Sequence, residues 1–167
     1  MRYLVFLLYA IAITNAGCYS FKGISIDPNT KTFYVNPFVN NAPNAVPTLP
    51  TTYTVLLNDK ISNESQLTRN TESPHIEFKG TITEFRVTAQ APTSTNDSDG
   101  VAFNRLTIGL RVEYIDNQDP DNNWSSQFKH FNDFGTDQNL IDIQDNLISN
   151  IGDQLMEDIF NRAFTNW

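Results

Sequence analysis

Residues 105–114 read Arg-Leu-Thr-Ile-Gly-Leu-Arg-Val-Glu-Tyr, and this stretch decides how the chain folds. Its even positions, from 106 to 114, are all apolar, whereas the odd positions hold arginine, threonine, glycine or glutamate. A period of two places successive side chains on opposite faces of a β-strand. The stretch therefore predicts a strand in a sheet with one buried apolar face and one polar face in contact with solvent.

The residues that follow predict a second strand paired with the first. Residues 116–123 are rich in Asp and Asn and indicate a hairpin loop. Alternation resumes at Trp124 and continues to His130, with Lys129 on the polar side. Because a short polar loop joins the two strands, we expect them to pair in antiparallel fashion.

The residues that precede residues 105–114 predict a third strand, at 76–87, whose alternation changes phase. A β-bulge near Thr83-Glu84 would keep all its apolar side chains on one face. A polar turn segment, Pro92 to Gly100, connects this strand to the next. The apolar side chains are those of Ile76, Phe78, Ile82, Phe85 and Val87.

Two helices and one further strand complete the pattern. Apolar residues at helical spacing predict a helix from about 49 to 65, with Pro50 in its first turn, where proline is tolerated. A second helix of some 25 residues is predicted from Thr136 onward, with an acidic polar face. Residues 32–38 predict a short strand, and residues 66–74 a polar loop.

The predicted order is β-α-β-β-β-α, which indicates an α+β fold. Two amphipathic helices would cover the apolar face of a four-stranded mixed sheet, giving a two-layer sandwich. A right-handed crossover would make the first two strands parallel, and the last three would form an antiparallel meander. The other sheet face would remain open.

The N-terminus predicts export. Met1-Arg2, eleven apolar residues and a small-residue segment ending in Gly17 have the layout of a secretory signal peptide. The only cysteine, Cys18, follows directly, as in bacterial lipoproteins, where it carries diacylglycerol and its amine is acylated with a fatty acid such as palmitate. We interpret residues 1–17 as a lipoprotein signal peptide, 18–31 as a lipid-anchored tether and 32–167 as one α+β domain.

Two alternatives to the lipid anchor remain open. One is an ordinary cleaved signal with an unmodified Cys18, since Asn15 stands where an aliphatic residue is usual. The other is a retained membrane helix, although eleven apolar residues are fewer than the roughly 20 that span a bilayer.

The charge balance argues against several partners. The chain has 11 Lys and Arg against 19 Asp and Glu, a formal net charge of −8. Loss of Arg2 with the signal peptide would make the mature chain one unit more negative. This balance argues against general nucleic-acid binding and against electrostatic attachment to anionic lipid head groups.

Basic residues nevertheless gather on the polar side of the predicted strands. One interpretation is a solvated face with cross-strand ion pairs. The other is a docking face for an anionic partner, such as glycolipid phosphates or acidic groups lining a protein cavity. The five residues are Lys79, Arg86, Arg105, Arg111 and Lys129.

Catalytic and metal-binding patterns are scarce. The only histidines are His75 and His130, and the single cysteine is already assigned to the anchor. The sequence contains no G-x-S-x-G nucleophile signature and no glycine-rich phosphate loop. We therefore expect no catalytic residues, no cofactor and no metal, and a protein that is not an enzyme.

Several segments together resemble one family, the lipopolysaccharide-assembly lipoproteins (LptE). The resemblance covers essentially the whole mature chain, and its specificity comes from the set of segments and their order. The segments are Gly17 to Phe21 with Gly23, Ser25 and Ile26; Lys31 to Val35, then Pro43, Pro47, Thr48 and Leu49; Phe78 to Thr83; Asn104 to Ile108; and Gln154 to Phe164 with Asn166 and Trp167.

The resemblance implies a two-helix, four-stranded sandwich that sits as a plug in the lumen of LptD, a large outer-membrane β-barrel. Such a pair takes part in lipopolysaccharide transport and outer-membrane assembly. The implied location is the outer membrane, lipid-anchored through Cys18 and facing the periplasm, with lipopolysaccharide as a possible ligand. A free periplasmic lipid- or peptide-binding lipoprotein without a barrel partner is the alternative.

Overall fold

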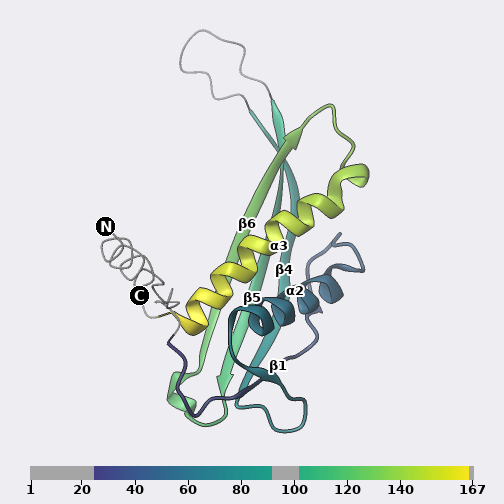
Figure 1. Cartoon of the computed structure of the whole chain (residues 1–167). Helices are drawn as coiled ribbons and strands as arrows, with labels where there is room; N and C mark the ends of the chain where they lie inside the picture. Colours follow the sequence, from purple (N-terminus) through teal and green to yellow (C-terminus); the bar gives the residue numbers. More distant parts are fainter. Residues whose placement is uncertain (1–24, 92–101, 166–167) are drawn as a thin grey trace, which may run out of the picture.

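The alternating stretch at residues 105–114 forms the centre of the sheet. In the computed structural model, which describes residues 25–91 and 102–165, it belongs to β5 (Phe103–Asp116). β5 lies between β4 (Ile76–Gln90) and β6 (Trp124–Gly135) and is antiparallel to both. The predicted meander is therefore confirmed, with each strand longer than its apolar pattern indicated (Figure 1).

The predicted bulge in β4 is also present. The β4–β5 register shifts between Ile82 and Glu84, so that Ile82 opposes Leu110 and Phe85 opposes Ile108. The additional residue restores the apolar phase, because Phe85 is now on the same face as Ile82. Both side chains are buried, with Ile82 at 0% and Phe85 at 9% exposure.

Within the described residues the sheet has six strands, and the expectation of four was wrong by two short strands. Pro37 interrupts the strand expected at 32–38, since proline has no N–H to donate to a ladder. The chain there forms β1 (Thr32–Val35) and β2 (Val39–Asn40), both parallel to β4. The loop expected at 66–74 contains β3 (Thr68–Arg69), which pairs parallel with β1.

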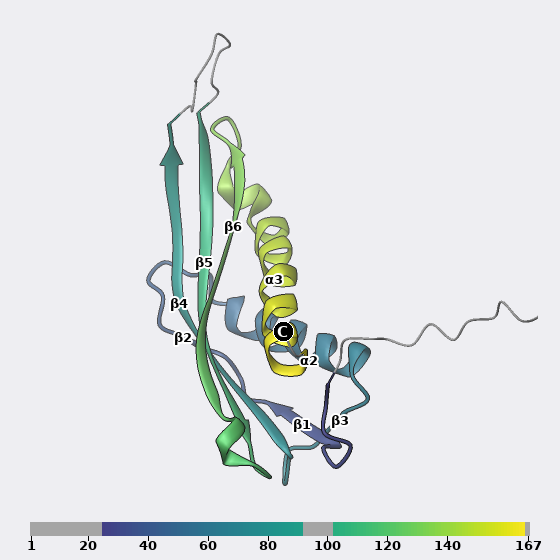
Figure 2. The same ribbon diagram turned by 90° about the vertical axis from the view of Figure 1, so that its left-hand side faces the viewer.

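Both helices form close to their predicted positions. α2 is Leu49–Glu64 and α3 is Leu140–Phe164, a helix of 25 residues. The Asn139 side chain caps α3 by accepting a hydrogen bond from the N–H of Ile141 at 3.2 Å. Figure 2 shows both helices on one side of the sheet, which confirms the two-layer α+β sandwich and leaves the other side open.

The core lies between the helices and the sheet. α2 contributes a stripe with four-residue spacing, whose side chains are all 0% exposed: Leu49, Tyr53, Leu57 and Ile61. β5 contributes its even-numbered apolar residues, β4 contributes Ile76, Phe78 and Ile82 before the bulge and Phe85 after it, and α3 contributes its inward-facing residues. Burial of this many apolar side chains is the main stabilising contribution to the fold.

The beginning and the end of the described chain meet. The N–H of Ser25 donates a hydrogen bond to the carbonyl oxygen of Phe164, at 2.6 Å. Thr30 is buried, and Ile26 packs against the core. The predicted signal peptide and Cys18 lie outside the described residues, and the domain boundary at residue 32 stays a prediction. In residues 25–91 and 102–165, no helix has the length and apolar character needed to cross a bilayer.

Candidate functional site: the open sheet face

The face of β4, β5 and β6 that points away from the helices is called here the open face. The strand register places all five basic residues on it, since side chains directly opposite in an antiparallel pair share a face. Cross-strand neighbours on this face are Lys79 and Glu113, Thr81 and Arg111, Arg86 and Thr107, Arg105 and Asp133, and Gly109 and Lys129.

Glu84 neutralises two of the five basic residues. Its carboxylate lies 2.6 Å from Nη2 of Arg86 and 2.7 Å from Nζ of Lys129. Lys129 is on β6, so the pair spans the width of β5 at Gly109, where the absence of a side chain leaves room for Glu84. The hydrogen bond from Lys129, together with that from Arg86, lowers the pKa of the Glu84 carboxyl.

Arg105 is also paired. Its Nε and Nη2 donate to the two carboxylate oxygens of Asp133 at 2.7 and 2.9 Å, a bidentate arrangement. This hydrogen bonding lowers the pKa of Asp133 and raises that of Arg105. The guanidinium also stacks over the Phe131 ring, 3.6 Å from its centroid, and Phe131 remains 52% exposed.

Lys79 and Arg111 are different, because neither forms an ion pair within the part of the chain that the structure describes. Both are exposed and line a hollow of about 380 Å³ where β2 meets the open face. The exposed Val39 and the polar side chains of Asn36 and Thr81 complete its wall. Its only carboxylate is that of Glu113.

The five candidate residues therefore do not act as one cluster. Three are held by carboxylates on the same face, which agrees with the interpretation of cross-strand ion pairs. Two converge on a concave region with surplus positive charge, which agrees with the interpretation of an anion-docking face. The sequence could not separate them, because the difference depends on the reach of Glu84 and Asp133 across neighbouring strands.

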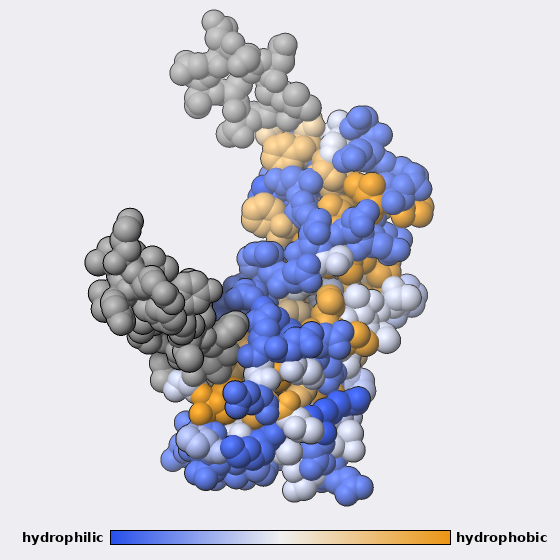
Figure 3. All heavy atoms as spheres, in the orientation of Figure 1, coloured by the Kyte–Doolittle hydropathy of each residue, from blue (hydrophilic) through white to orange (hydrophobic). Residues whose placement is uncertain are grey.

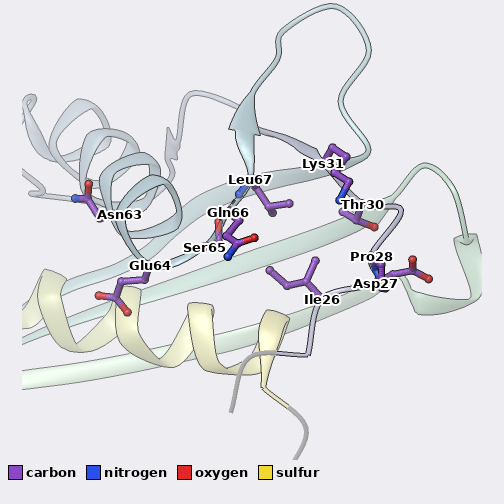
Figure 4. Close-up of a pocket in the computed structure, with 10 residues that line it drawn as sticks. All are labelled: Ile26, Asp27, Pro28, Thr30, Lys31, Asn63, Glu64, Ser65, Gln66 and Leu67. Atoms are coloured by element: carbon purple, nitrogen blue, oxygen red, sulfur yellow. Dashed lines mark hydrogen bonds between the residues drawn. The ribbon is translucent and has the colours of Figure 1, made fainter. Parts of the chain in front are cut away.

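A larger pocket of about 500 Å³ lies between the N-terminal segment and the end of α2 (Figure 4). Ile26 and Leu67 extend toward its interior, and Asp27 and Glu64 stand at opposite ends. Lys31 is its only basic side chain. The pocket combines an apolar floor with a polar rim and contains none of the five open-face residues.

The two histidines are engaged in structural contacts. Nδ1 of His75 accepts a hydrogen bond from the N–H of Lys31 at 3.1 Å. Nε2 of His130 lies 2.7 Å from Oδ2 of Asp158, which links β6 to α3. Within residues 25–91 and 102–165, no group of three or more His, Cys, Asp or Glu side chains is arranged to hold a metal ion.

Sequence reasoning missed the exposed aromatic residue of this face. The predicted strand ended at His130, whereas β6 continues to Gly135 and includes Phe131 and Asp133. The available signal was a phenylalanine on the polar side of an alternating strand, two residues from Lys129 and two from Asp133.

Comparison with known families gives one match. The model of the family described as "LptE: Lipopolysaccharide-assembly" matches residues 30–163, which include every described helix and strand except the last residue of α3. No curated protein is similar enough to the chain by sequence to count as a relative.

Two solved structures share the fold at low identity, and a third is less similar. A point variant of the PelC dodecamer from Paraburkholderia phytofirmans is 11% identical, with a TM-score of 0.52, covering 86% of this chain and 94% of that one. A second PelC dodecamer structure from the same organism is 12% identical with a TM-score of 0.50, covering 86% and 95%. A minor lipoprotein from Acinetobacter baumannii is 12% identical with a TM-score of 0.46, covering 79% and 91%.

Proposed function

Because the chain belongs to the LptE family of lipopolysaccharide-assembly proteins, we propose that it is the plug and partner of an LptD-type outer-membrane β-barrel. In this role it takes part in lipopolysaccharide transport and outer-membrane assembly. It is an outer-membrane lipoprotein, anchored through an acylated Cys18 and facing the periplasm. The observation that carries the proposal is the family match over residues 30–163, which covers the sandwich almost completely.

The surface of the domain suits such a role. A domain inside a barrel lumen needs polar outer surfaces, because the interior of such barrels is polar. The helix side of the molecule is mostly hydrophilic in Figure 3, with hydrophobic residues in smaller patches at the upper end, in the middle and at the lower left. The opposite side is the open face, whose side chains are largely charged or small and polar.

The hollow beside Lys79 and Arg111 is the proposed contact for an anionic group. Phosphates of lipopolysaccharide and carboxylates of a barrel wall share this chemistry, and a guanidinium can bind either with two parallel hydrogen bonds. Of the five basic residues, these two need not break an existing ion pair to bind. The other three basic residues already form ion pairs with carboxylates of this chain. To bind an anionic partner, each would first have to leave that carboxylate: Arg86, Arg105 and Lys129.

The testing experiment is an affinity purification of the membrane-extracted protein in mild detergent, followed by intact mass measurement of every chain recovered. We expect a stoichiometric β-barrel partner, and a mass equal to residues 18–167 plus diacylglycerol and an acyl chain. A Cys18→Ser variant should lose the lipid mass and the membrane association. If the acylated protein were recovered without a barrel partner although such barrels were abundant in the membrane, the plug role would be contradicted. The proposal of a lipid anchor at Cys18 would still stand.

The second candidate is a free periplasmic lipid- or peptide-binding lipoprotein. The pocket of about 500 Å³ beside Ile26 and Leu67 is the observation that favours it. The same purification separates the two, because this candidate predicts a small molecule or peptide with the protein and no barrel.

A further inference from the structure

β6 is an unusually open sheet edge. It pairs with β5 along its whole length of 12 residues, and no described strand pairs with its outer side. In such a strand, every second residue directs its N–H and C=O outward. Among the hydrogen bonds of the described residues, two reach the backbone of β6 from outside the sheet, and both join Gly135, its last residue, to Gln138.

The opposite edge of the sheet is covered along the first half of β4, whereas Glu84 to Gln90 pair only with β5. β1 and β2 cover β4 as far as Ile82, and the bulge between Ile82 and Glu84 interrupts regular pairing directly above them. Bulges, prolines and short strands are the usual ways in which proteins blunt an edge. β6 has a regular register with β5, and it contains no proline.

The sequence of β6 is complementary to itself. Residues 128–134 read Phe-Lys-His-Phe-Asn-Asp-Phe, with Phe131 at the centre. When this segment is placed antiparallel to a second copy about Phe131, Lys129 opposes Asp133 and His130 opposes Asn132. Phe131 then opposes itself, whereas Phe134, which opposes Phe128, is already buried in the core of its own chain. Opposite charges and aromatic pairs at facing positions stabilise antiparallel strands.

We propose that β6 is a self-association edge, at which two copies of this chain pair through residues 128–134 around a two-fold axis at Phe131. The pairing joins two sheets into one continuous sheet through backbone hydrogen bonds. It is isologous, since the same segment is used by both copies. The partner is a second copy of this chain because, when the segment is paired with itself in antiparallel orientation, Lys129 faces Asp133 and Phe131 faces Phe131.

The surroundings of Phe131 favour this arrangement. Its ring, 52% exposed, is held from one side by the Arg105 guanidinium, which Asp133 fixes in turn. In the pair, the two Phe131 rings would meet between two such arginines. Asp133 would keep its ion pair with Arg105 and gain Lys129 of the second copy as a neighbour. Lys129 would likewise keep Glu84 and gain Asp133 of the second copy.

The N-terminal half of α3 leaves the outer edge of β6 free, whereas its C-terminal half contacts the segment through Asp158 and His130. Figure 1 shows α3 crossing β6 obliquely, so that its N-terminal half lies away from the outer edge of the upper part of β6. That upper part contains residues 128–134. This inference goes beyond the proposed function and concerns copies that are not enclosed in a barrel, because a domain that fills a barrel lumen leaves no room for a second copy at β6.

The test uses cysteine cross-linking of the detergent-extracted full-length protein under mild oxidation, with the unsubstituted chain reporting any background from Cys18. Phe131→Cys places two thiols face to face and should give a disulfide-linked dimer. Gln127→Cys is the matched control, on the same face and edge of the same strand. Its two copies would lie about 26 Å apart along the strands, and it should give only background.

Charge exchange between chains provides the second measurement. In a homodimer of the Lys129→Asp variant, the new carboxylate would face the Asp133 carboxylate of the second copy. In a homodimer of the Asp133→Lys variant, the new ammonium group would face Lys129, so both homodimers contain like charges at facing positions. Each variant in a Phe131→Cys background should therefore lose its homodimer. A mixture of the two, with distinguishable tags, should form the mixed dimer, because both facing pairs are then of opposite charge.

Equal cross-linking at positions 127 and 131 would overturn the proposal, as would a mixture that yields no more mixed dimer than either variant alone. Thermal denaturation of each variant shows that the chain remains folded. Because recovery of a barrel partner is measured separately, failure of self-association and failure of the plug role are distinguishable.

Discussion

The hydroxyl of Tyr53 on α2 donates a hydrogen bond to the carbonyl oxygen of Ile148 on α3, 3.2 Å away, in the interior of the protein. The two helices come close here because α3 has a glycine at the crossing. A Cβ added to Gly152 would lie 2.8 Å from Cδ1 of Leu56 and 2.9 Å from Cε1 of Tyr53. Tyr53 thus fixes the helix layer while its ring is completely buried.

Replacement of Tyr53 by phenylalanine should lower the free energy of unfolding by about 0.5–1.5 kcal/mol, the usual net contribution of one hydrogen bond. The ring is retained, so no cavity forms. Urea denaturation measures the change. Tyr34→Phe is the control, since the Tyr34 hydroxyl makes no hydrogen bond within residues 25–91 and 102–165. Equal losses in both variants would contradict the importance of the Ile148 contact.

Stability should fall at alkaline pH because of two buried tyrosines. Burial raises the pKa of Tyr114 to about 12, with a further contribution from the Asp116 charge, and burial followed by the Asp153 charge raises that of Tyr53 still more. An unfolded tyrosine has a pKa of about 10. Above pH 10 the unfolded state releases protons that the native state retains, so this contribution to stability is lost as the pH rises.

The expected slope is at most about 1.4 kcal/mol per pH unit for each tyrosine between its unfolded and folded pKa values. Denaturation measured from pH 9 to 12 tests this slope. Tyr114→Phe should make the decline shallower. A flat profile in the unsubstituted protein over that range would refute the assignment.

Gly80→Ala should destabilise the protein by about 1–3 kcal/mol, the cost of overpacking a core. A Cβ at position 80 would overlap the ring of Phe38, which is 4% exposed and packs directly over the glycine. The control is Gly135→Ala, where the added Cβ meets mainly the carboxylate of Asp137, the end of an exposed side chain that can rotate away.

A second substitution identifies the cause. Phe38→Leu in the Gly80→Ala background removes the ring and should recover part of the lost stability relative to the sum of the two single changes. Strict additivity in that double-mutant cycle would show that the two side chains do not compete for one space.

Charge reversal should separate the two groups of basic residues. Lys79→Glu with Arg111→Glu is expected to reduce binding of an anionic partner at least tenfold, with little change in melting temperature, because neither residue has an ion pair to lose. Arg86→Glu with Lys129→Glu is the matched control, and it should affect stability more, since three carboxylates would then meet at Glu84.

The readouts are co-purification of the barrel partner, binding to purified lipopolysaccharide and thermal denaturation of the same samples. The docking role of the Lys79 and Arg111 hollow would have to be abandoned if the folded double variant bound both partners as well as the unsubstituted protein.

Long, regular patterns made most of the fold predictable. The helix expected at 49–65 is observed at Leu49–Glu64, and the bulge follows from the phase change after Ile82. β2 and β3 were missed because strands of two residues are too short to show a period. They exist through pairing with β4 and β1, a tertiary effect that local sequence does not carry.

The candidate site was only partly predictable. Alternation alone put five basic residues on one face, because side-chain direction in a strand follows from position. Which of them are neutralised depends on ion pairs between side chains on different strands. Glu84 on β4 extends past Gly109 to Lys129 on β6, and Asp133 on β6 pairs with Arg105 on β5. Such pairing requires knowledge of the register and could not be obtained from the spacing of charges along the chain.

The hydrogen bond between Ser25 and Phe164 has a consequence for how the polypeptide can be engineered. Since the two ends of the described fold lie side by side, a short linker could close the backbone into a ring. New termini could then be opened in the polar connection after Glu64, giving a circular permutant that keeps the long strands and both helices. Such a permutant would move any membrane tether to a different corner of the domain while leaving its interior unaltered.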